Sequence, residues 1–410
     1  MAPKQSKSGL IVIFLTVFLD LVGFGIIIPL SPYLARQFSA SPFQIGFLMA
    51  IYSLMQFVFS PFWGGLSDRV GRRPVILISL LGGMFSYLIF AFSSSILMLF
   101  IARGLAGVFG GNISAAHAYI ADITPAHERS KGMGLLGAAF GLGFIFGPLL
   151  GGALGVVGQH IGSEPPFGLS FSALGAAGLC LANFLFAWKV LGESLPPEKR
   201  KLTTSSNVGK RRRVQEIITQ LRRPVVGSLI FVFFLSGLAM AQMESMLFPF
   251  VADVFHWDLK TASLGFAYIG ILMVFTQGYL IRKWMPILGE PKVLSIGLLL
   301  FSISLFAIPG STTVALIGVT MTVLGVGNGM MRPPTIGAIS LLTPDHEQGA
   351  VMGVTNSIAS LGRILGPLIG GYIYEHMSRG APFFLAGTLG ATALCLVLVE
   401  YKKLPSTGRN

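Results

Sequence analysis

Long apolar runs separated by short polar segments dominate the pattern of this 410-residue chain. Each run is about 20 residues long, which lets a helix cross the roughly 30 Å hydrocarbon core of a bilayer. The pattern predicts an all-α membrane protein with twelve transmembrane helices. The predicted spans are 10–34, 43–63, 74–93, 96–119, 132–155, 167–190, 225–250, 262–281, 293–309, 312–335, 349–374 and 382–400. Only a few residues separate the third span from the fourth and the ninth from the tenth.

The two halves of the chain resemble each other. Adding 219 to a residue number aligns 124–152 with 343–371 without a gap, and 14 of these 29 positions are identical. Two pseudo-symmetric six-helix bundles with a site at their interface are typical of secondary transporters. We therefore predict an N-terminal bundle (1–190), a cytoplasmic basic linker (191–223) and a C-terminal bundle (224–410).

Composition and charge narrow the class of protein. The chain is 53% hydrophobic and 11% charged, whereas a soluble chain has about 25% charged residues. Its net charge of +13 follows topology and does not predict nucleic-acid binding: with a cytoplasmic N-terminus, only Arg36, Lys260 and Arg379 among the basic residues lie outside. This asymmetry predicts a multi-pass plasma-membrane protein, in a bacterium the inner membrane, with both termini in the cytoplasm.

Two further observations concern processing and bound groups. The apolar segment after Lys4 and Lys7 is too long for the core of a cleaved signal peptide. Cys180 and Cys395 fall in the sixth and twelfth spans, where small packing residues are expected. Neither a disulfide framework, a metal site nor a cofactor is predicted.

The first half carries two charges inside its predicted spans. Asp20 lies near the middle of the first helix, and Arg103 lies about seven residues inside the fourth. Burial favours a neutral carboxyl group and a nearby arginine favours the charged form, so substrate or water between them would change protonation. We predict proton coupling by Asp20 and Arg103; a static structural ion pair is the alternative. Arg103, Gly107, Gly110, Ser114 and His117 share one helical face, which we expect to line a cavity.

The second half has its own charges within the predicted spans. Glu244, flanked by methionines in the seventh helix, is a second candidate for proton coupling, a cation-binding carboxylate or a gate residue nearer the outer surface. Arg332 and Arg363 stand where the first half has Ile113 and Phe144. Arg363 neutralises an anionic substrate or binds Glu244, and the sequence leaves both open. The predicted substrate cavity contains Phe24, Gly107, Ser114, Met240, Met243 and Arg363.

The loop between the second and third spans carries the most specific motif. Residues 64–74 read GGLSDRVGRRP, in which glycines permit a tight turn and opposed charges lie close together. This string closely resembles the helix 2–3 signature of the major facilitator superfamily; a loop of solvated charges is the alternative. The whole chain resembles the drug:proton antiporter branch of that superfamily, near the tetracycline and multidrug efflux proteins.

The resemblance implies a cytoplasmic gate and an antiporter motif. In the gate, Asp68 faces the N-terminus of the eleventh helix, and Arg72 or Arg69 pairs with Asp122. The predicted gate residues are Gly64, Asp68, Arg69, Gly71, Arg72, Arg73 and Asp122. The antiporter motif, through which the fifth helix packs on the eighth, comprises Gly143, Gly147, Pro148, Gly151 and Gly152. General glycine packing is the alternative, because the string recurs at 366–371.

The resemblance also implies the function. We expect a monomeric secondary transporter in the lipid bilayer that exports hydrophobic or amphipathic drugs against proton entry by alternating access. Ser86 precedes Tyr87 where tetracycline exporters have an acidic residue, which argues against tetracycline itself. The alternatives are an exporter or flippase of a specific metabolite or lipid, and a sensor or scaffold. An enzyme is not expected, because the titratable residues lack a nucleophile–base spacing.

Overall fold

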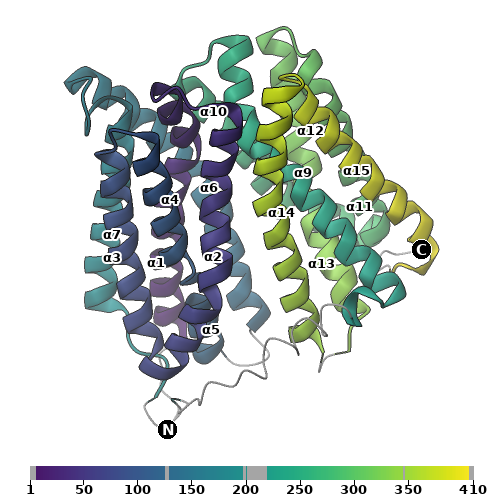
Figure 1. The fold of residues 1–410 in the computed structure, drawn as a ribbon. Coiled ribbons are helices and arrows are strands. Elements are labelled where there is room, and N and C mark those ends of the chain that lie inside the picture. The colour runs from purple at the N-terminus through teal and green to yellow at the C-terminus, as the bar shows by residue number, and fades with distance from the viewer. Residues whose placement is uncertain (1–5, 125–128, 197–199, 201–218, 345–346, 406–410) are drawn as a thin grey trace. The chain divides into compact units, whose positions relative to one another are not determined.

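The computed structural model describes residues 6–124, 129–196, 200, 219–344 and 347–405. These residues form helices and short connections without a β-strand (Figure 1). The basic run at 210–213, within the predicted linker, lies outside the described residues. The helices are α1 (Ser6–Gln37), α2 (Pro42–Val70), α3 (Arg72–Ala91), α4 (Ile96–Gly110), α5 (Ile113–Ile123), α6 (Arg129–Ile161), α7 (Phe171–Val190), α9 (Pro224–Phe255), α10 (Leu259–Phe275), α11 (Ile281–Ala307), α12 (Val314–Gly329), α13 (Arg332–Leu341), α14 (Gln348–His376) and α15 (Ala381–Glu400).

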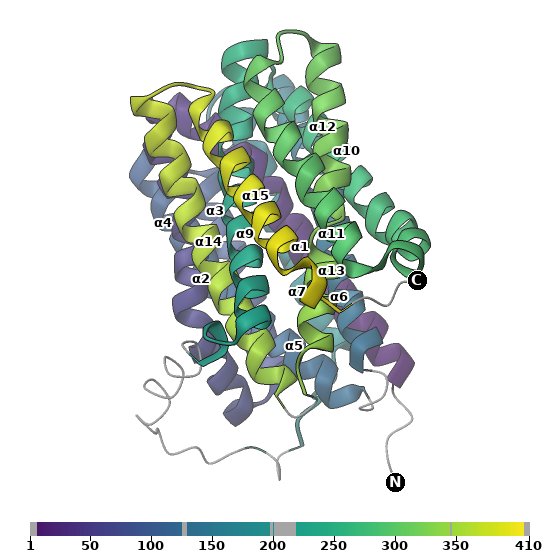
Figure 2. The same cartoon turned by 90° about the vertical axis from the view of Figure 1, so that its right-hand side faces the viewer.

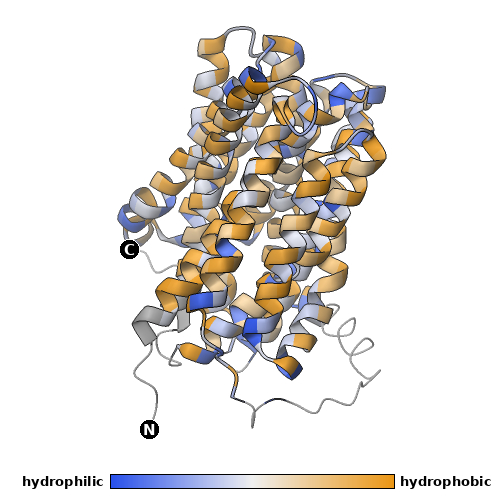
Figure 3. Ribbon diagram, turned by 90° about the vertical axis from the view of Figure 1, so that its left-hand side faces the viewer, coloured by the Kyte–Doolittle hydropathy of each residue, from blue (hydrophilic) through white to orange (hydrophobic). Residues whose placement is uncertain are grey.

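Ten stretches of the described residues are long and apolar enough to cross a membrane. One of them, Leu259–Gly310, holds two spans because Gly289 adopts a φ of 73° and interrupts the helix there. The 29-residue helix α14, which carries Arg363, completes the twelve spans. Figure 3 shows that these helices are mainly hydrophobic along their length. The predicted all-α fold is confirmed, and the closely spaced third and fourth spans are separate helices.

Polar side chains fix where several helices begin. The Ser95 hydroxyl accepts a hydrogen bond from the Met98 amide at the start of α4, and Thr313 does the same at α12. Asp258 Oδ1 accepts from the amide of Thr261, 2.9 Å away, in the first turn of α10. Each cap satisfies a backbone N–H that has no partner within its helix.

The contacts divide the chain into two compact units. Unit 1 comprises Met1–Ala40, Ile51–Thr204 and Trp257–Ala267, and unit 2 comprises Ser41–Ala50, Ser205–His256 and Tyr268–Asn410. Each unit contains most of one predicted bundle and a short segment of the other. The predicted domain boundaries at 190 and 224 stay a prediction.

Unit 1 is organised around α1. This helix packs against α6 and α7, while α3 packs against α7 and α4. A continuous apolar core contains Ile13, Val75 and Ala139, all fully buried, together with neighbours from α5 and α7. In unit 2, α9 is the helix that corresponds to α1, and α14 and α15 pack against it (Figure 2).

The glycines of α6 lie against α1. A Cβ atom added to Gly147 would stand 2.5 Å from the Cα of Gly25, and one added to Gly143 would stand 2.8 Å from the Cβ of Leu21. Side chains at these positions would force the two backbones apart. Gly143, Gly147 and Gly151 face α1, whereas Gly152 faces the start of α10, which is the predicted eighth helix. The antiporter role of the motif stays a prediction.

The repeated glycines of α14 follow the same scheme. Gly362 and Gly366 lie against Leu238 of α9, with the Cβ positions 3.0 and 2.7 Å from its backbone N and O atoms. Gly371 instead faces the first turn of α2. The sequence repeat is thus a structural repeat, in which the glycine helix of each half packs on the first helix of that half.

Candidate functional site

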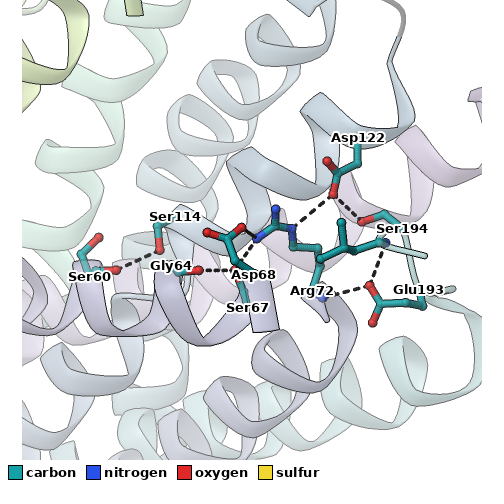
Figure 4. A network of polar contacts seen from close by, with 10 residues as sticks. Ser60, Gly64, Ser67, Asp68, Arg72, Ser114, Asp122, Glu193 and Ser194 are labelled. Atoms are coloured by element: carbon teal, nitrogen blue, oxygen red, sulfur yellow. Dashed lines mark hydrogen bonds and ion pairs between the residues drawn. The ribbon is translucent and has the colours of Figure 1, made fainter. Parts of the chain in front are cut away.

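The first group of predicted residues lies where α2 meets α3. Gly71 separates the two helices with a φ of 111°, which a side chain would strain. Arg72, the first residue of α3, is only 7% exposed. Its guanidinium contacts the Asp68 carboxylate at 2.6 Å and the Asp122 carboxylate at 3.2 Å, and it donates to the Ser67 hydroxyl at 2.7 Å (Figure 4). Of the two arginines proposed to pair with Asp122, Arg72 makes this contact.

The carboxylates of Asp68 and Asp122 stabilise the buried guanidinium of Arg72. Removing a guanidinium from water costs several kcal/mol, and close carboxylates offset that cost only when its N–H groups are also satisfied. Here two carboxylates and a hydroxyl surround it. Arg69 is exposed, and Arg73 donates to the carbonyl of Trp188 at 2.6 Å. That Asp68 faces the N-terminus of the eleventh helix stays a prediction.

Glu193 and Ser194 complete this group and were not predicted. The Glu193 carboxylate accepts from the backbone amides of Arg72 and Arg73 at 2.9 and 3.2 Å, so an anion caps the N-terminus of α3. Ser194 donates to Asp122 at 3.1 Å. No local spacing in the sequence connects these positions, because more than 70 residues separate each from its partner. They lie at the start of the segment predicted as linker.

The second group lies inside the membrane-spanning part of unit 1. Asp20 is half-buried in α1 and hydrogen-bonds the Asn112 side chain. Both residues line a small pocket, whose other walls come from Thr16 and Val17 of α1, Ile76 and Leu80 of α3, and Ile113 and Ala116 of α5. Asn112 sits in the break between α4 and α5, where the chain leaves helical hydrogen bonding. An amide therefore faces the carboxyl group that we predict to carry protons.

Arg103 is 2% exposed and lies among aromatic rings. Its guanidinium carbon is 5.0 Å from the ring centroid of Tyr52 and 5.8 Å from that of Phe24. These distances allow cation–π attraction, which is strongest where water is absent. Tyr87 interacts electrostatically with both Arg103 and Asp20. A direct Asp20–Arg103 pair stays a prediction.

The predicted cavity face of the fourth span is divided by the helix break. Gly107 is buried against α2, where an added Cβ would lie 2.4 Å from the carbonyl oxygen of Tyr52. Ser114, in α5, donates to the Ser60 carbonyl at 3.2 Å, and His117 is exposed. Gly107 thus has a packing contact with α2, and the cavity-lining roles of these residues stay predictions.

The third group lies in unit 2. Glu244 is half-buried in α9 and interacts electrostatically with Arg363 of α14, which in turn interacts with Arg332 at the start of α13. Both arginine side chains are exposed. Met240, one turn before Glu244, is half-buried, whereas Met243 is 1% exposed and belongs to the core. A role for Met243 in substrate contact stays a prediction.

No group of three or more histidine, cysteine or acidic side chains that could hold a metal ion occurs in the described part of the chain. Cys180 is buried and Cys395 is exposed, and both are free thiols.

Several known proteins are similar to this chain in sequence. The chain is 32% identical to the class B tetracycline resistance protein of Escherichia coli over 366 residues, covering 87% of this chain and 86% of that protein. It is 29% identical to multidrug resistance protein 2 of Bacillus subtilis, covering 98% and 97% of the two chains.

Solved structures agree with these relatives. The human organic anion transporter MFSD10 has a TM-score of 0.71 and 25% identity, with 96% of this chain and 100% of that chain covered. The family model described as Major Facilitator Superfamily matches residues 13–290 and 281–409. The chain therefore belongs to the major facilitator superfamily.

Proposed function

We propose that this protein is a proton-coupled antiporter that exports hydrophobic or amphipathic drugs by alternating access. Family membership makes it a transporter and not an enzyme. Tetracycline and multidrug resistance proteins among its relatives support drug export. The observation that carries proton coupling is the placement of Asp20, a carboxyl group within a membrane helix, beside the amide of Asn112.

The mechanism assigns separate tasks to the groups described above. Asp20 takes up a proton from one side of the membrane and releases it to the other. The Arg72 network holds α2, α3 and α5 together on the cytoplasmic side in one state of the cycle. Substrate binding displaces the proton, so inward proton flow drives export.

The topology belongs to the same proposal. The positive-inside distribution of basic residues supports cytoplasmic termini in the inner membrane of a bacterium. The proposal includes a monomer embedded in lipid, and the long apolar helices support the lipid environment.

Transport in proteoliposomes tests the proposal. An imposed pH gradient is expected to drive accumulation of an amphipathic dye by the wild-type protein, and Asp20→Asn is expected to abolish accumulation while leaving downhill dye exchange intact. Asn112→Asp serves as a comparison that keeps the polar contact but adds a second carboxyl group. Undiminished gradient-driven transport by Asp20→Asn would exclude Asp20 as the coupling residue.

Export of a specific metabolite or lipid is the second candidate. The human relative named as an organic anion transporter favours considering non-drug substrates. Lipid flipping would appear as movement of labelled phospholipid between leaflets in the same proteoliposomes. Absence of proton-coupled movement for drugs, together with such flipping, would favour this candidate.

A further inference from the structure

The fourth membrane span is interrupted near its middle. α4 ends at Gly110 and α5 begins at Ile113, within the apolar stretch Ile96–Ile123. Backbone groups that lose their helical partners inside a membrane must find new ones, because lipid offers neither donors nor acceptors. The partners at this helix break therefore show what holds its shape.

The helix break releases two carbonyl groups. In a continuous α-helix, each carbonyl accepts a hydrogen bond from the amide four residues later. The amides of Asn112 and Ser114 instead donate to the carbonyls three residues earlier, at 3.3 and 3.4 Å. The carbonyls of Val108 and Gly110 thereby lose the amides that a continuous helix would give them.

Two side chains of α2 bind these carbonyl groups. The indole N–H of Trp63 donates to the carbonyl of Val108. The side-chain amide of Gln56 donates to the carbonyl of Gly110 at 3.0 Å. These bonds replace the helical ones, so α2 stabilises the broken form of the span.

The backbone of α2 also packs closely on the helix break. A Cβ atom added to Gly111 would lie 2.8 Å from the indole ring of Trp63 and 3.1 Å from the backbone nitrogen of Ser60. The hydroxyl of Ser114 donates to the carbonyl of Ser60 at 3.2 Å (Figure 4). Such close contact fixes the position of the break relative to α2.

Asn112 faces α1 from within the helix break. It is 8% exposed, lines the same pocket as Asp20 and hydrogen-bonds the Asp20 side chain. Its own amide takes part in the altered hydrogen bonding of the break. The position of the Asn112 side chain therefore depends on the contacts that α2 makes on the other side.

The matching break in unit 2 is satisfied differently. It lies between α12 and α13, and adding 219 places Val108 on Gly327 and Asn112 on Met331. The carbonyl of Gly327 accepts from the amide of Met330, in its own turn, at 3.1 Å. A break at this place does not by itself require a donor from a neighbouring helix, and the polar contacts of α2 occur in the half that carries Asp20.

We propose that Gln56 and Trp63 are positioning residues for the proton site, which hold the helix break so that the Asn112 amide stays against the Asp20 carboxyl group. The proposal rests on the coupling role of Asp20 and adds two residues of α2 to that site. An amide that donates to a carboxylate stabilises its charged form. Without the two donors of α2, Val108 and its neighbours regain helical hydrogen bonds, and the amide moves away from the carboxyl group.

Other titratable side chains also face the proton site. Tyr87 of α3 and Cys180 of α7 interact electrostatically with Asp20. Arg103 of α4 interacts with Tyr87, and His117 of α5 is exposed. These groups stay unchanged in every variant of the test.

Infrared difference titration of the full chain in lipid nanodiscs measures the proton site directly. The C=O stretch of the protonated Asp20 carboxyl group is identified by its loss in Asp20→Asn and followed across pH. Trp63→Phe removes the indole N–H and keeps an aromatic ring, Gln56→Met removes the amide donor, and Asn112→Leu removes the amide at the site. Trp188→Phe is the matched control, because it makes the same change on α7 at a side chain that is 54% exposed.

Asn112→Leu is expected to move the midpoint of this titration to higher pH by about half a unit or more, because a hydrogen bond to the carboxylate is lost. Trp63→Phe and Gln56→Met are expected to move it in the same direction, and Trp188→Phe leaves it at the wild-type value. The double variant Trp63→Phe/Asn112→Leu is expected to have the midpoint of Asn112→Leu alone, since both changes remove the same contact.

Three results overturn the proposal. The first is an unchanged midpoint in Asn112→Leu, and the second is a shift in Trp63→Phe that adds in full to that of Asn112→Leu. The third is a wild-type midpoint in Trp63→Phe, with or without a shift in Gln56→Met, because the Gln56 amide also lies 3.4 Å from the hydroxyl of Tyr52. If Trp63→Phe does not fold, Gln56→Met and its combination with Asn112→Leu decide.

The titration needs no transport, so this inference and the proposed function fail separately. Undiminished gradient-driven transport by Asp20→Asn refutes coupling by Asp20, whereas the expected shifts would still show that α2 positions Asn112. Proton-coupled transport by the wild type, together with a wild-type midpoint in Trp63→Phe, supports the antiporter and refutes the positioning role.

Discussion

Replacing Arg72 with glutamine removes the cation that pairs with Asp68 and Asp122. Asp68 and Asp122 then face each other's charge without compensation, and Ser67 loses its donor. The Arg72 backbone amide, which donates to Glu193, is retained. The perturbation therefore addresses the ion pairs and not the helix cap.

The expected loss follows from the exposure of the partners. Breaking a fully buried ion pair costs about 3–5 kcal/mol because a charge is left without a partner. The side chains of Asp68 and Asp122 are 45% and 25% exposed, so water recovers part of that cost. We expect local opening at the junction of α2 and α3 to become easier by about 2 kcal/mol, which corresponds to roughly 30-fold faster exchange of its amides.

Hydrogen–deuterium exchange of the protein in detergent measures this directly. Peptides covering 67–76 report the junction, and the middle of α7 is an internal reference. Lys283→Gln, an exposed substitution in the second half, controls for loss of a surface cation. The double variant Arg72→Gln/Asp122→Asn is expected to be less destabilised than the sum of the single changes, by about 1 kcal/mol or more. Exchange within twofold of wild type, or strict additivity, would refute this account of the network.

Two further predictions concern helix packing and capping. Gly147→Ala is expected to lower the free energy of unfolding by about 1–3 kcal/mol, because the added Cβ would meet Gly25. The control Gly137→Ala, on the same helix, meets nothing within 4 Å and is expected to be neutral or stabilising. Thermal unfolding of both variants checks this. Burial raises the pKa of Asp258, but hydrogen bonds from Thr261 outweigh it and hold the pKa below its ordinary value of 3.8. The cap therefore stabilises α10 above that pH, and this stabilisation is lost as the pH falls below it. Asp258→Ala is expected to lower the free energy of unfolding by about 1 kcal/mol at neutral pH and by progressively less in acid. Unfolding midpoints of both proteins across pH measure this.

The elements of this fold were predictable because each is encoded locally. A run of about 20 apolar residues has no alternative to a helix in a bilayer, so hydropathy alone gave the twelve spans. The junction of α2 and α3 was similarly predictable, since Gly71 and the charges beside it lie within one short string. The sequence left Arg72 and Arg69 as alternative partners for Asp122, and the structure shows the contact for Arg72 at 3.2 Å.

The partners missed by sequence reasoning come from distant parts of the chain. Glu193 caps α3 from 121 residues away, and Ser194 donates to Asp122 from 72 residues away. The contact of Gly143, Gly147 and Gly151 with α1 was not predicted, because a small-residue face shows that a helix packs closely but not on which helix. Which helix a residue contacts depends on the three-dimensional arrangement of the helices and not on the spacing of residues within one helix.

The described charges fall into two groups that differ in their surroundings. At helix ends, Arg72 pairs with Asp68 and Asp122, and Arg223 pairs with Glu347. These pairs lie where water lowers the cost of charge, and they fix how helices begin and end.

Within the spans, the contacts are of another kind. Asp20 has an amide partner, and Arg103 lies over aromatic rings. Charged side chains within a membrane are costly, and they mark proton and substrate pathways. In the proposed mechanism, a proton that binds Asp20 removes its negative charge, so the binding energy of the proton is available to shift the protein between its states.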